Sequence, residues 1–332
     1  MKRNLLIIFA ALPLVLFSCY RDIDMEKYLP EPELVLNGII SADTTVMLSI
    51  SRTKFFTDTS RYGIVTDADV SLSVNGEFRE QMRWTADASF YGGGIYLSGY
   101  RPQTGDVVRI EAATKYGEAW VEEKIPAKVV IEDVAFFHKL IYDHKGFSID
   151  KDGNWVEIPK MEITYRITFT DDATLTNYYL IRIENSLSAY FGVGNLDYSS
   201  DPVFMEQVSV VDGLFGDNTI MGQGGRSFTD HLLNGQRYTL VVKENHPSSG
   251  NKEYFSHDSG RRIILYAITE SYFNYLTTMQ RAADAEVNTN LSTFGFTEPV
   301  RIFTNIHGGT GIMATSQYDA VTIDLGDNIF LD

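Results

Sequence analysis

Apolar and polar residues alternate along much of this chain, which is the pattern of β-strands that bury one face. The clearest run covers residues 161–169, where every second residue from Met161 to Phe169 is apolar and the residues between them are polar. Shorter runs of the same kind occur at 46–50, 70–74 and 108–112. The pattern predicts a mainly β protein.

Frequent turn signals divide the first part of the chain into short strands. Asn75-Gly76 follows an alternating run directly, and such a pair favours a two-residue hairpin turn. Gly105 and Gly117 mark two further turns. Short strands with regular turns over residues 34–126 predict an immunoglobulin-like β-sandwich. Pro126 ends this predicted domain, because proline cannot continue a ladder of strand hydrogen bonds.

Residues 127–332 predict a second, larger β-rich domain with one helix. Further strands are expected at 178–183, 237–242, 262–268, 300–303 and 321–325. The helix is expected at residues 270–286, because the apolar residues there recur at helical spacing and form one stripe. These residues are Tyr272, Tyr275, Leu276, Met279 and Ala283. A long insert at 185–236, rich in glycine, serine and aromatic residues, separates two of the strands.

The first 33 residues predict an export signal followed by a lipid anchor. Lys2 and Arg3 precede an apolar run at 5–17, which is too short to span a bilayer that needs roughly 20 apolar residues. Ser18-Cys19 then resembles the end of a bacterial lipobox, in which the cysteine becomes the acylated N-terminus. Residues 1–18 are therefore predicted to be a signal peptide and Cys19 a lipidation site. An ordinary signal peptide with an incidental cysteine is the alternative.

Residues 19–33 predict a solvated, acidic tether, because they hold five acidic and two basic side chains and two prolines. An acidic stretch after the cysteine resembles the surface-export signal of Bacteroidota lipoproteins. We therefore expect an outer-membrane protein exposed on the cell surface. The periplasmic face of the outer membrane is the alternative.

Charge and cysteine content exclude several classes of function. The chain has 28 basic and 44 acidic residues and a net charge of −16. A nucleic-acid partner is not expected, because phosphate binding needs a basic surface. Cys19 is the one cysteine, so the mature domains have no disulfide, thiolate nucleophile or cysteine metal site.

No motif in the sequence predicts a catalytic site, a metal site or a cofactor. Residues 150–155 begin like a calcium loop, but Trp155 and Met161 occupy the positions that need glycine and glutamate, so a hairpin turn is expected. His257-Asp258-Ser259 holds the residue types of a catalytic triad, but adjacency in sequence does not give triad geometry. The glycine-rich stretches at 222–225 and 307–311 lack the lysine of a phosphate loop and predict turns.

The histidines and two pairs of adjacent acidic residues are the other side chains that could take part in catalysis or metal binding. The six histidines form no H-E-x-x-H pair and no pair four residues apart. They are His138, His144, His231, His246, His257 and His307. The paired acids at 122–123 and 171–172 are expected to be solvated.

Aromatic residues of the long insert are the candidate ligand-binding residues. They are Tyr190, Phe191, Tyr198, Phe204 and Phe215. The alternative is that they pack the insert onto its own domain.

Five ordered stretches resemble a Bacteroidota outer-membrane lipoprotein family catalogued only as a domain of unknown function. They are 35–40 leading into 46–56, 65–77, 228–238, 270–276, and Phe296-Thr297-Glu298-Pro299-Val300 followed by 304–312. Genes of this family typically lie beside TonB-dependent receptors. The resemblance therefore implies a lipoprotein that assists such a receptor. No catalytic residues are established for the family.

Three functions remain open at this point. The first is a non-enzymatic accessory or ligand-binding partner of a TonB-dependent nutrient transporter. The second is a structural or adhesive surface lipoprotein, and the third is a secreted hydrolase.

Overall fold

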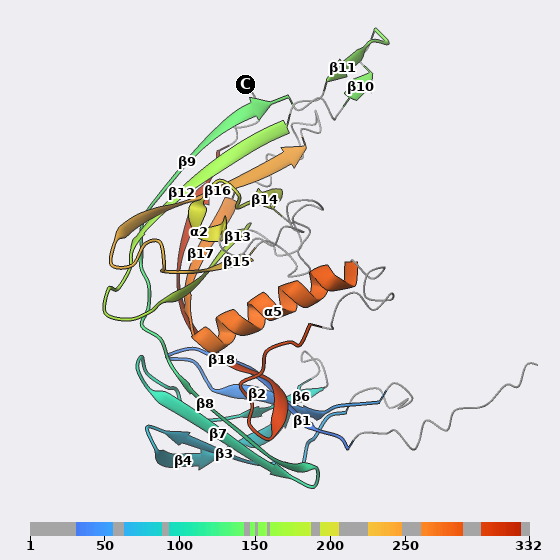
Figure 1. The fold of residues 1–332 in the computed structure, drawn as a ribbon, viewed down its shortest axis with the longest axis vertical. Coiled ribbons are helices and arrows are strands. Elements are labelled where there is room, and N and C mark those ends of the chain that lie inside the picture. The colour runs from blue at the N-terminus through green and yellow to red at the C-terminus, as the bar shows by residue number, and fades with distance from the viewer. Residues whose placement is uncertain are drawn as a thin grey trace, which may run out of the picture.

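The computed structural model describes residues 31–55, 63–87, 93–142, 147–149, 152–157, 160–186, 193–205, 225–247, 260–287 and 300–326. The predicted signal peptide, Cys19 and most of the predicted tether lie outside these ranges. The fold is mainly β, as the alternating pattern predicts (Figure 1).

The N-terminal unit contains eight strands in two sheets. These strands are β1 (Leu34–Ile40), β2 (Met47–Arg52), β3 (Asp69–Val74), β4 (Glu77–Gln81), β5 (Arg83–Ala86), β6 (Gly94–Leu97), β7 (Val107–Thr114) and β8 (Gly117–Lys124). One sheet has the order β4-β3-β7-β8, and the other contains β1-β2-β6-β5. The alternating residues of both sheets, including Leu36, Leu72 and Ile110, form one core. The immunoglobulin-like topology stays a prediction.

The C-terminal unit has a second core between two sheets. Its strands are β9 (Ile131–Ile141), β10 (Phe147–Ile149), β11 (Trp155–Glu157), β12 (Lys160–Thr170), β13 (Tyr178–Asn185), β14 (Asn195–Asp197), β15 (Gly225–Thr229), β16 (Arg237–Pro247) and β17 (Gly260–Ile268). The order β14-β16-β12-β9 forms one sheet, and β15-β13-β17 belong to the other. Apolar residues of both sheets, such as Ile167 and Leu265, meet in this core.

Within the described residues, two helices accompany these strands. The short α2 (Pro202–Met205) belongs to the insert, and α5 (Glu270–Val287) confirms the helix that the apolar stripe predicts. Phe273 and Leu276 of α5 pack on Leu180 and Ile268, on the face of the sheet opposite the second core. In Figure 1, α5 lies between the two units.

The last strand, β18 (Gly309–Asp324), belongs to both units. Its first half pairs in parallel with β1, from Leu34↔Gly309 to Ile40↔Thr315. Its second half pairs antiparallel with β17, from Ile268↔Ser316 to Gly260↔Asp324. One eight-stranded sheet therefore runs through both units.

Residues near the C-terminus thus complete the N-terminal core. Ile306 and Met313 are buried there, although the division of the sequence after Pro126 places both in the second domain. The strand expected at 300–303 is wrong, because these residues form no strand. The strand expected at 321–325 is the end of the much longer β18.

The predicted turns are confirmed at several glycines. Asn75 and Gly76 both have positive φ, as a tight hairpin turn requires. Gly153 has φ +83° between β10 and β11, which confirms a hairpin in place of a calcium loop. Gly308 has positive φ and forms a turn before β18, which confirms the turn at that residue, whereas Gly309 to Gly311 already belong to β18 and pair with β1. Gly222 to Gly224 lie outside the described residues.

Candidate functional site

A cleft of about 500 Å³ lies at the junction of the two units. It is lined by the turn at 104–105, the link at 124–129, the end of β12, the loop at 172–177 and the first residue of α5. Clefts between units are common places for ligand sites, because two surfaces can enclose one ligand. This cleft is the candidate functional site.

The residues that line the cleft are both apolar and charged. The apolar ones include Ile125, Pro126, Val129 and Ile268, and the aromatic ones are Tyr178 and Tyr179. Lys124, Lys128, Asp172 and Glu270 supply charges of both signs. Such a lining suits a small amphipathic ligand.

Strand β18 fixes one wall of the cleft. The hydroxyl of Thr315 donates to the carbonyl of Lys124 at 2.6 Å. The Gln317 side-chain amide donates to Thr104 Oγ1 at 2.8 Å and also to the carbonyl of Pro126. Lys128 Nζ lies 2.8 Å from Asp319 Oδ1. The link between the units is therefore held along its length.

The opposite wall is fixed by a small network around Asn177. The Asn177 side chain donates to the carbonyls of Asp172 and Leu175 at 2.8 and 3.1 Å. Its backbone N–H donates to the Asp230 carboxylate at 2.7 Å. These hydrogen bonds hold the loop at 172–177 in one conformation where it lines the cleft.

A half-buried carboxylate joins the two units behind the cleft. Glu123 of β8 accepts hydrogen bonds from Ser271 at the start of α5 and, at 2.8 Å, from the Asn305 side chain. Burial raises the pKa of Glu123 despite these bonds, and the nearby Glu270 adds to the rise. The expectation that both acids of the 122–123 pair are solvated is wrong for Glu123.

The raised pKa of Glu123 makes a prediction about stability. The fold favours the protonated form of Glu123 over the ionised form. The contribution of Glu123 to the free energy of unfolding is therefore fully present at acidic pH, and it is lost as the pH rises through the folded-state pKa. Glu123→Gln keeps an acceptor for Asn305 and should raise the free energy of unfolding at pH 8 by about 0.5–2 kcal/mol. The gain should shrink at pH 4. Urea unfolding at both pH values measures it, with the exposed Glu122→Gln as the control. Equal effects at both positions would contradict the prediction.

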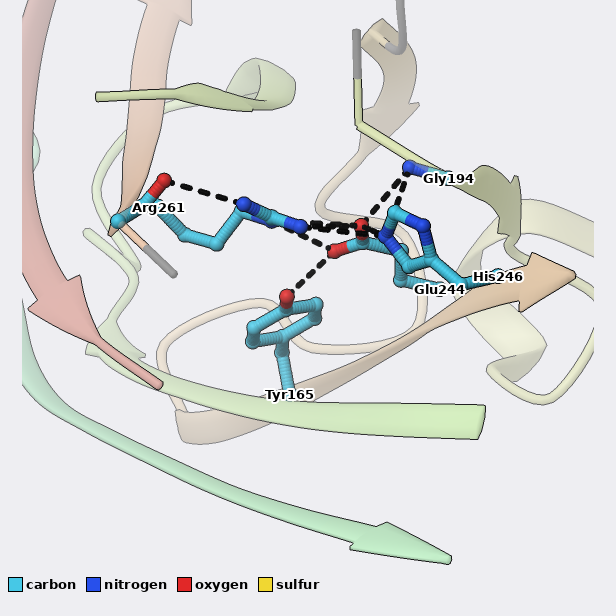
Figure 2. Close-up of polar contacts among 6 residues, drawn as sticks. Tyr165, Gly194, Glu244, His246 and Arg261 are labelled. Atoms are coloured by element: carbon cyan, nitrogen blue, oxygen red, sulfur yellow. Dashed lines mark hydrogen bonds and ion pairs between the residues drawn. The ribbon is translucent and has the colours of Figure 1, made fainter. Parts of the chain in front are cut away.

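A buried ionic cluster lies inside the C-terminal unit (Figure 2). Glu244 of β16 accepts from Arg261 Nε at 3.0 Å and Nη2 at 2.9 Å. It also accepts from the Tyr165 hydroxyl at 2.5 Å and the Gly194 N–H at 2.8 Å, and it contacts the His246 ring. Arg261 and Glu244 are both 0% exposed.

The electrostatics of the cluster keep Glu244 ionised. Burial opposes its charge, but hydrogen bonds and charge from His246 and Arg261 outweigh burial and hold the pKa of Glu244 well below its usual range. Burial, with the Glu244 charge, raises the pKa of Tyr165, so this hydroxyl stays protonated. Both carboxylate oxygens already accept at least two hydrogen bonds. Glu244 therefore ties β12 and β16 of one sheet to β17 of the other, and it has no free acceptor for proton transfer.

Two buried aspartates serve the fold in a similar way. Asp171 accepts from the Tyr179 hydroxyl at 2.5 Å and from the Gly235 N–H at 2.7 Å. Asp201 accepts from the Tyr238 hydroxyl at 2.6 Å and from the Val241 N–H at 2.7 Å. Asp171 is 4% exposed, so the expectation of a solvated 171–172 pair holds for Asp172 alone.

The candidate aromatic residues of the insert do not meet at a surface where the structure describes them. Tyr198 and Phe204 are buried in the second core and contact each other edge to face, with ring centroids 5.0 Å apart. Tyr190, Phe191 and Phe215 lie outside the described residues, as does Cys19.

Neither the ionic cluster nor the cleft is predicted from the sequence. A signal for the cluster exists: Glu244 and His246 continue the alternating buried positions of Leu240 and Val242 on β16. Polar residues at the buried positions of an alternating strand indicate a network of hydrogen bonds inside the protein. The cleft has no comparable signal, because turns from both units form it.

Within the described ranges, no three histidine, cysteine, aspartate or glutamate residues are grouped so that they could hold a metal ion. The helices in the described part of the chain are all too short or too polar to cross a membrane.

A family model described as "Domain of unknown function (DUF4249)" matches residues 21–321. No curated protein matches the chain.

Proposed function

The chain belongs to the DUF4249 family, and from this premise we propose that it is a lipid-anchored outer-membrane protein that binds a ligand for a TonB-dependent nutrient transporter. The observation that carries the proposal is the cleft between the two units, which is lined by apolar and charged residues and held by hydrogen bonds. The family resemblance supports the transporter as partner. The chemistry of the chain supports binding in preference to catalysis.

The anchor in this proposal is Cys19. Several acyl chains on one cysteine hold a protein stably, because each buried methylene contributes about 0.8 kcal/mol and a single chain binds only marginally. The acidic residues after Cys19 support export to the cell surface. There the cleft would meet nutrients before the transporter does.

Hydrogen bonding in the C-terminal unit favours a binding role over a hydrolase. Glu244, Asp171 and Asp201 each accept at least two hydrogen bonds from the fold. A general base must lie within reach of its substrate, whereas these three carboxylates are at most 4% exposed. The continuous sheet through both units supports a structural or adhesive role as the second candidate.

Purification of the tagged full-length protein from outer membranes tests the main proposal. A β-barrel receptor should be recovered with it in stoichiometric amounts. Repeated recovery without a receptor, combined with a defect in adhesion on deletion, would favour the structural role.

A variant that fills the cleft tests the binding site itself. Leu175 is 58% exposed at the rim, so Leu175→Trp should obstruct the cleft and leave the fold stable. Uptake of the receptor's substrate should fall several-fold in cells that carry this variant. The control is Leu232→Trp at another exposed leucine, which is not part of the cleft lining. Unchanged uptake in the Leu175 variant would exclude this cleft as the binding site.

Removal of the anchor gives a separate prediction. Cys19→Ala should shift the protein from the membrane fraction to the soluble fraction, because no acyl chain can be attached. Ser18→Ala keeps a small residue before the cut and should leave the protein in the membrane. Immunoblots of fractionated cells measure both. A Cys19→Ala protein that stays with membranes would contradict lipidation.

A further inference from the structure

Strand β9 forms the edge of its sheet and is unusually long for an edge strand. The sheet has the order β14-β16-β12-β9, so β9 pairs with β12 on one side, and no strand in the described part of the chain pairs with its other side (Figure 1). It has 11 residues, whereas the other edge strands of the larger sheets, β4, β5, β8, β14 and β15, have three to eight. Soluble proteins usually keep edge strands short, because unpaired backbone groups recruit another strand.

Most of this edge is open to a further strand. Its start is covered, because the Ile131 N–H donates to the Asp319 carboxylate at 3.0 Å. The one irregularity in the pairing with β12 also lies near that end, opposite Thr168 and Phe169. From 133 to 141 the register is regular, and the sequence contains no proline or glycine. Nothing in this stretch bends the backbone away from a partner strand.

Alternate residues of the open stretch lie on the outer face of the sheet. The exposed residues of this row are Asp133, Ala135, Phe137 and Lys139. Val134 and Phe136, which lie between the first three, are half-buried against the second core. Phe137 is 50% exposed. The row therefore runs from an acid, through a small and a large apolar residue, to a base.

This row is complementary to itself when it is reversed. In an antiparallel pair of two β9 strands centred on Phe136, Asp133 lies opposite Lys139 of the second copy. Ala135 lies opposite Phe137 in the same register, and a two-fold axis repeats both pairs. Side chains directly opposite each other have Cβ atoms about 4.5–5.5 Å apart, so the opposite charges attract and the small alanine leaves room for the phenylalanine ring.

Other registers of the same pairing lose these matches. A shift of two residues places Asp133 opposite Phe137, or Ala135 opposite Lys139. A shift of one residue would place the side chains on opposite faces. One register therefore satisfies charge, size and the alternation of faces together.

Both charged residues are available for the contact. Asp133 is exposed and has no ion pair or hydrogen bond with another described residue. Lys139 Nζ lies 3.0 Å from Glu162 Oε1, and its side chain is 57% exposed. An ammonium group has three donors, so Lys139 can keep this ion pair and also contact Asp133 of a second copy.

Other occupants of the edge match it less closely. A lipid surface offers no partners for the unpaired backbone groups. A strand of a different protein could pair with the backbone, but the order of charges and sizes in β9 matches β9 itself. The net charge of −16 opposes association at long range, but physiological salt largely screens exposed charges more than about 8 Å apart. The charges at the contact therefore decide the pairing.

We propose that two copies of this chain associate through β9, antiparallel about a two-fold axis at Phe136, so that their two four-stranded sheets join into one. The inference does not depend on the proposed function. It assigns a contact surface to residues that neither the cleft nor the ionic cluster involves.

Exchange of the two charges tests the pairing. Cells produce the full-length chain with two different tags, and the recovery of one tagged copy with the other is measured. Asp133→Lys places lysine opposite lysine, and Lys139→Asp places aspartate opposite aspartate. Each variant alone, on both tags, should lower the recovery at least about fivefold, because like charges directly opposite destabilise a strand pair. A mixture with one variant on each tag has opposite charges in both pairs and should be recovered near the wild-type level.

The mixture separates pairing from a loss of stability. Lys139→Asp also removes the ion pair with Glu162, but a chain damaged by that loss would not regain its partner in the mixture. Glu118→Lys, at an exposed acid of the N-terminal unit, is the control and should not change the recovery. No joint recovery of wild-type copies, equal recovery in every combination, or no restoration in the mixture would each overturn the proposal.

Engineered cysteines measure the register. Opposite residues in an antiparallel pair have Cα atoms about 4.5–5.5 Å apart, which suits a disulfide. Ala135→Cys on one tag and Phe137→Cys on the other should therefore cross-link on mild oxidation. Ala135→Cys on both tags should not, because diagonal neighbours are about 7–8 Å apart. The chain without an engineered cysteine gives the background, since Cys19 is its one natural cysteine.

Two results of the cross-linking would contradict the proposal. Equal cross-linking of the mixed pair and of Ala135→Cys on both tags would exclude this register. An adduct with a different protein, in place of the dimer, would assign the edge of β9 to another partner. The transporter role is tested separately, because recovery of a receptor with Asp133→Lys does not require a second copy.

Discussion

Replacement of Arg261 by methionine should lower the free energy of unfolding by about 3–5 kcal/mol, the cost usual for breaking a buried ion pair. Arg261 and Glu244 are fully buried, and the guanidinium supplies two of the hydrogen bonds to the carboxylate. Without it, Glu244 would stay ionised in a low-dielectric interior or take up a proton. Either outcome costs free energy. Urea unfolding at pH 7 measures the loss.

The neighbouring arginine provides a matched control. Arg262 pairs with Glu184 at 3.0 Å, but its side chain is 39% exposed. Exposed ion pairs contribute about 0–1 kcal/mol, so Arg262→Met should change the stability little. Similar losses for the two variants would contradict the assigned role of the cluster.

The ionic cluster also predicts a direction for acid sensitivity. The pKa of Glu244 is lowered in the fold, so its stabilisation is present above the unfolded-state pKa and is lost as the pH falls towards the folded-state value. Arg261→Met removes part of that lowering. The difference in stability between wild type and variant should therefore narrow as the pH is decreased.

Gly308→Ala should lower the free energy of unfolding by about 1–3 kcal/mol more than Gly76→Ala, because overpacking adds to backbone strain. Gly308 has φ +74°, and a Cβ there would lie 2.3 Å from the carbonyl oxygen of Glu118. Gly76 has φ +78°, with nothing within 4 Å of a Cβ. An alanine at either position would therefore have the same backbone strain, but only at position 308 would its Cβ collide with another part of the chain. Urea unfolding of both variants measures the difference.

The close approach at Gly308 has a clear structural purpose. The backbone of the preceding residue, His307, exchanges two hydrogen bonds of 2.9 Å with Trp120, and the two rings stack with centroids 3.9 Å apart. This contact with β8 positions the backbone immediately before β18 begins at Gly309. If Gly308→Ala and Gly76→Ala cost the same, the contact does not depend on the glycine.

Local features of this fold could be predicted because they are encoded over a few residues. Alternation from Met161 to Phe169 gives β12, and the apolar stripe at 272–276 gives the buried side of α5. Asn75-Gly76 and Gly153 give two hairpins, since each turn needs positive φ. In each case the burial or the backbone conformation follows from neighbouring positions.

Long-range features could not be predicted in the same way. Parallel pairing of 34–40 with 309–315 joins the two ends of the chain, and no local pattern specifies a partner so far away. Glu123, Asp171 and Glu244 are polar, and their burial depends on hydroxyl, amide and guanidinium partners from other strands. The cleft likewise arises only when the two units come together.

The shared strand β18 links the folding of this protein to the order in which its chain is synthesised. A chain that emerges N-terminus first cannot close the sheet around β1 until residues 309–315 have followed, and it cannot complete the first core without Ile306 and Met313. The N-terminal unit therefore remains incomplete until the chain as far as residue 315 has been synthesised. Strand β18 is needed to complete both units, so their folding is coupled through residues that are synthesised late.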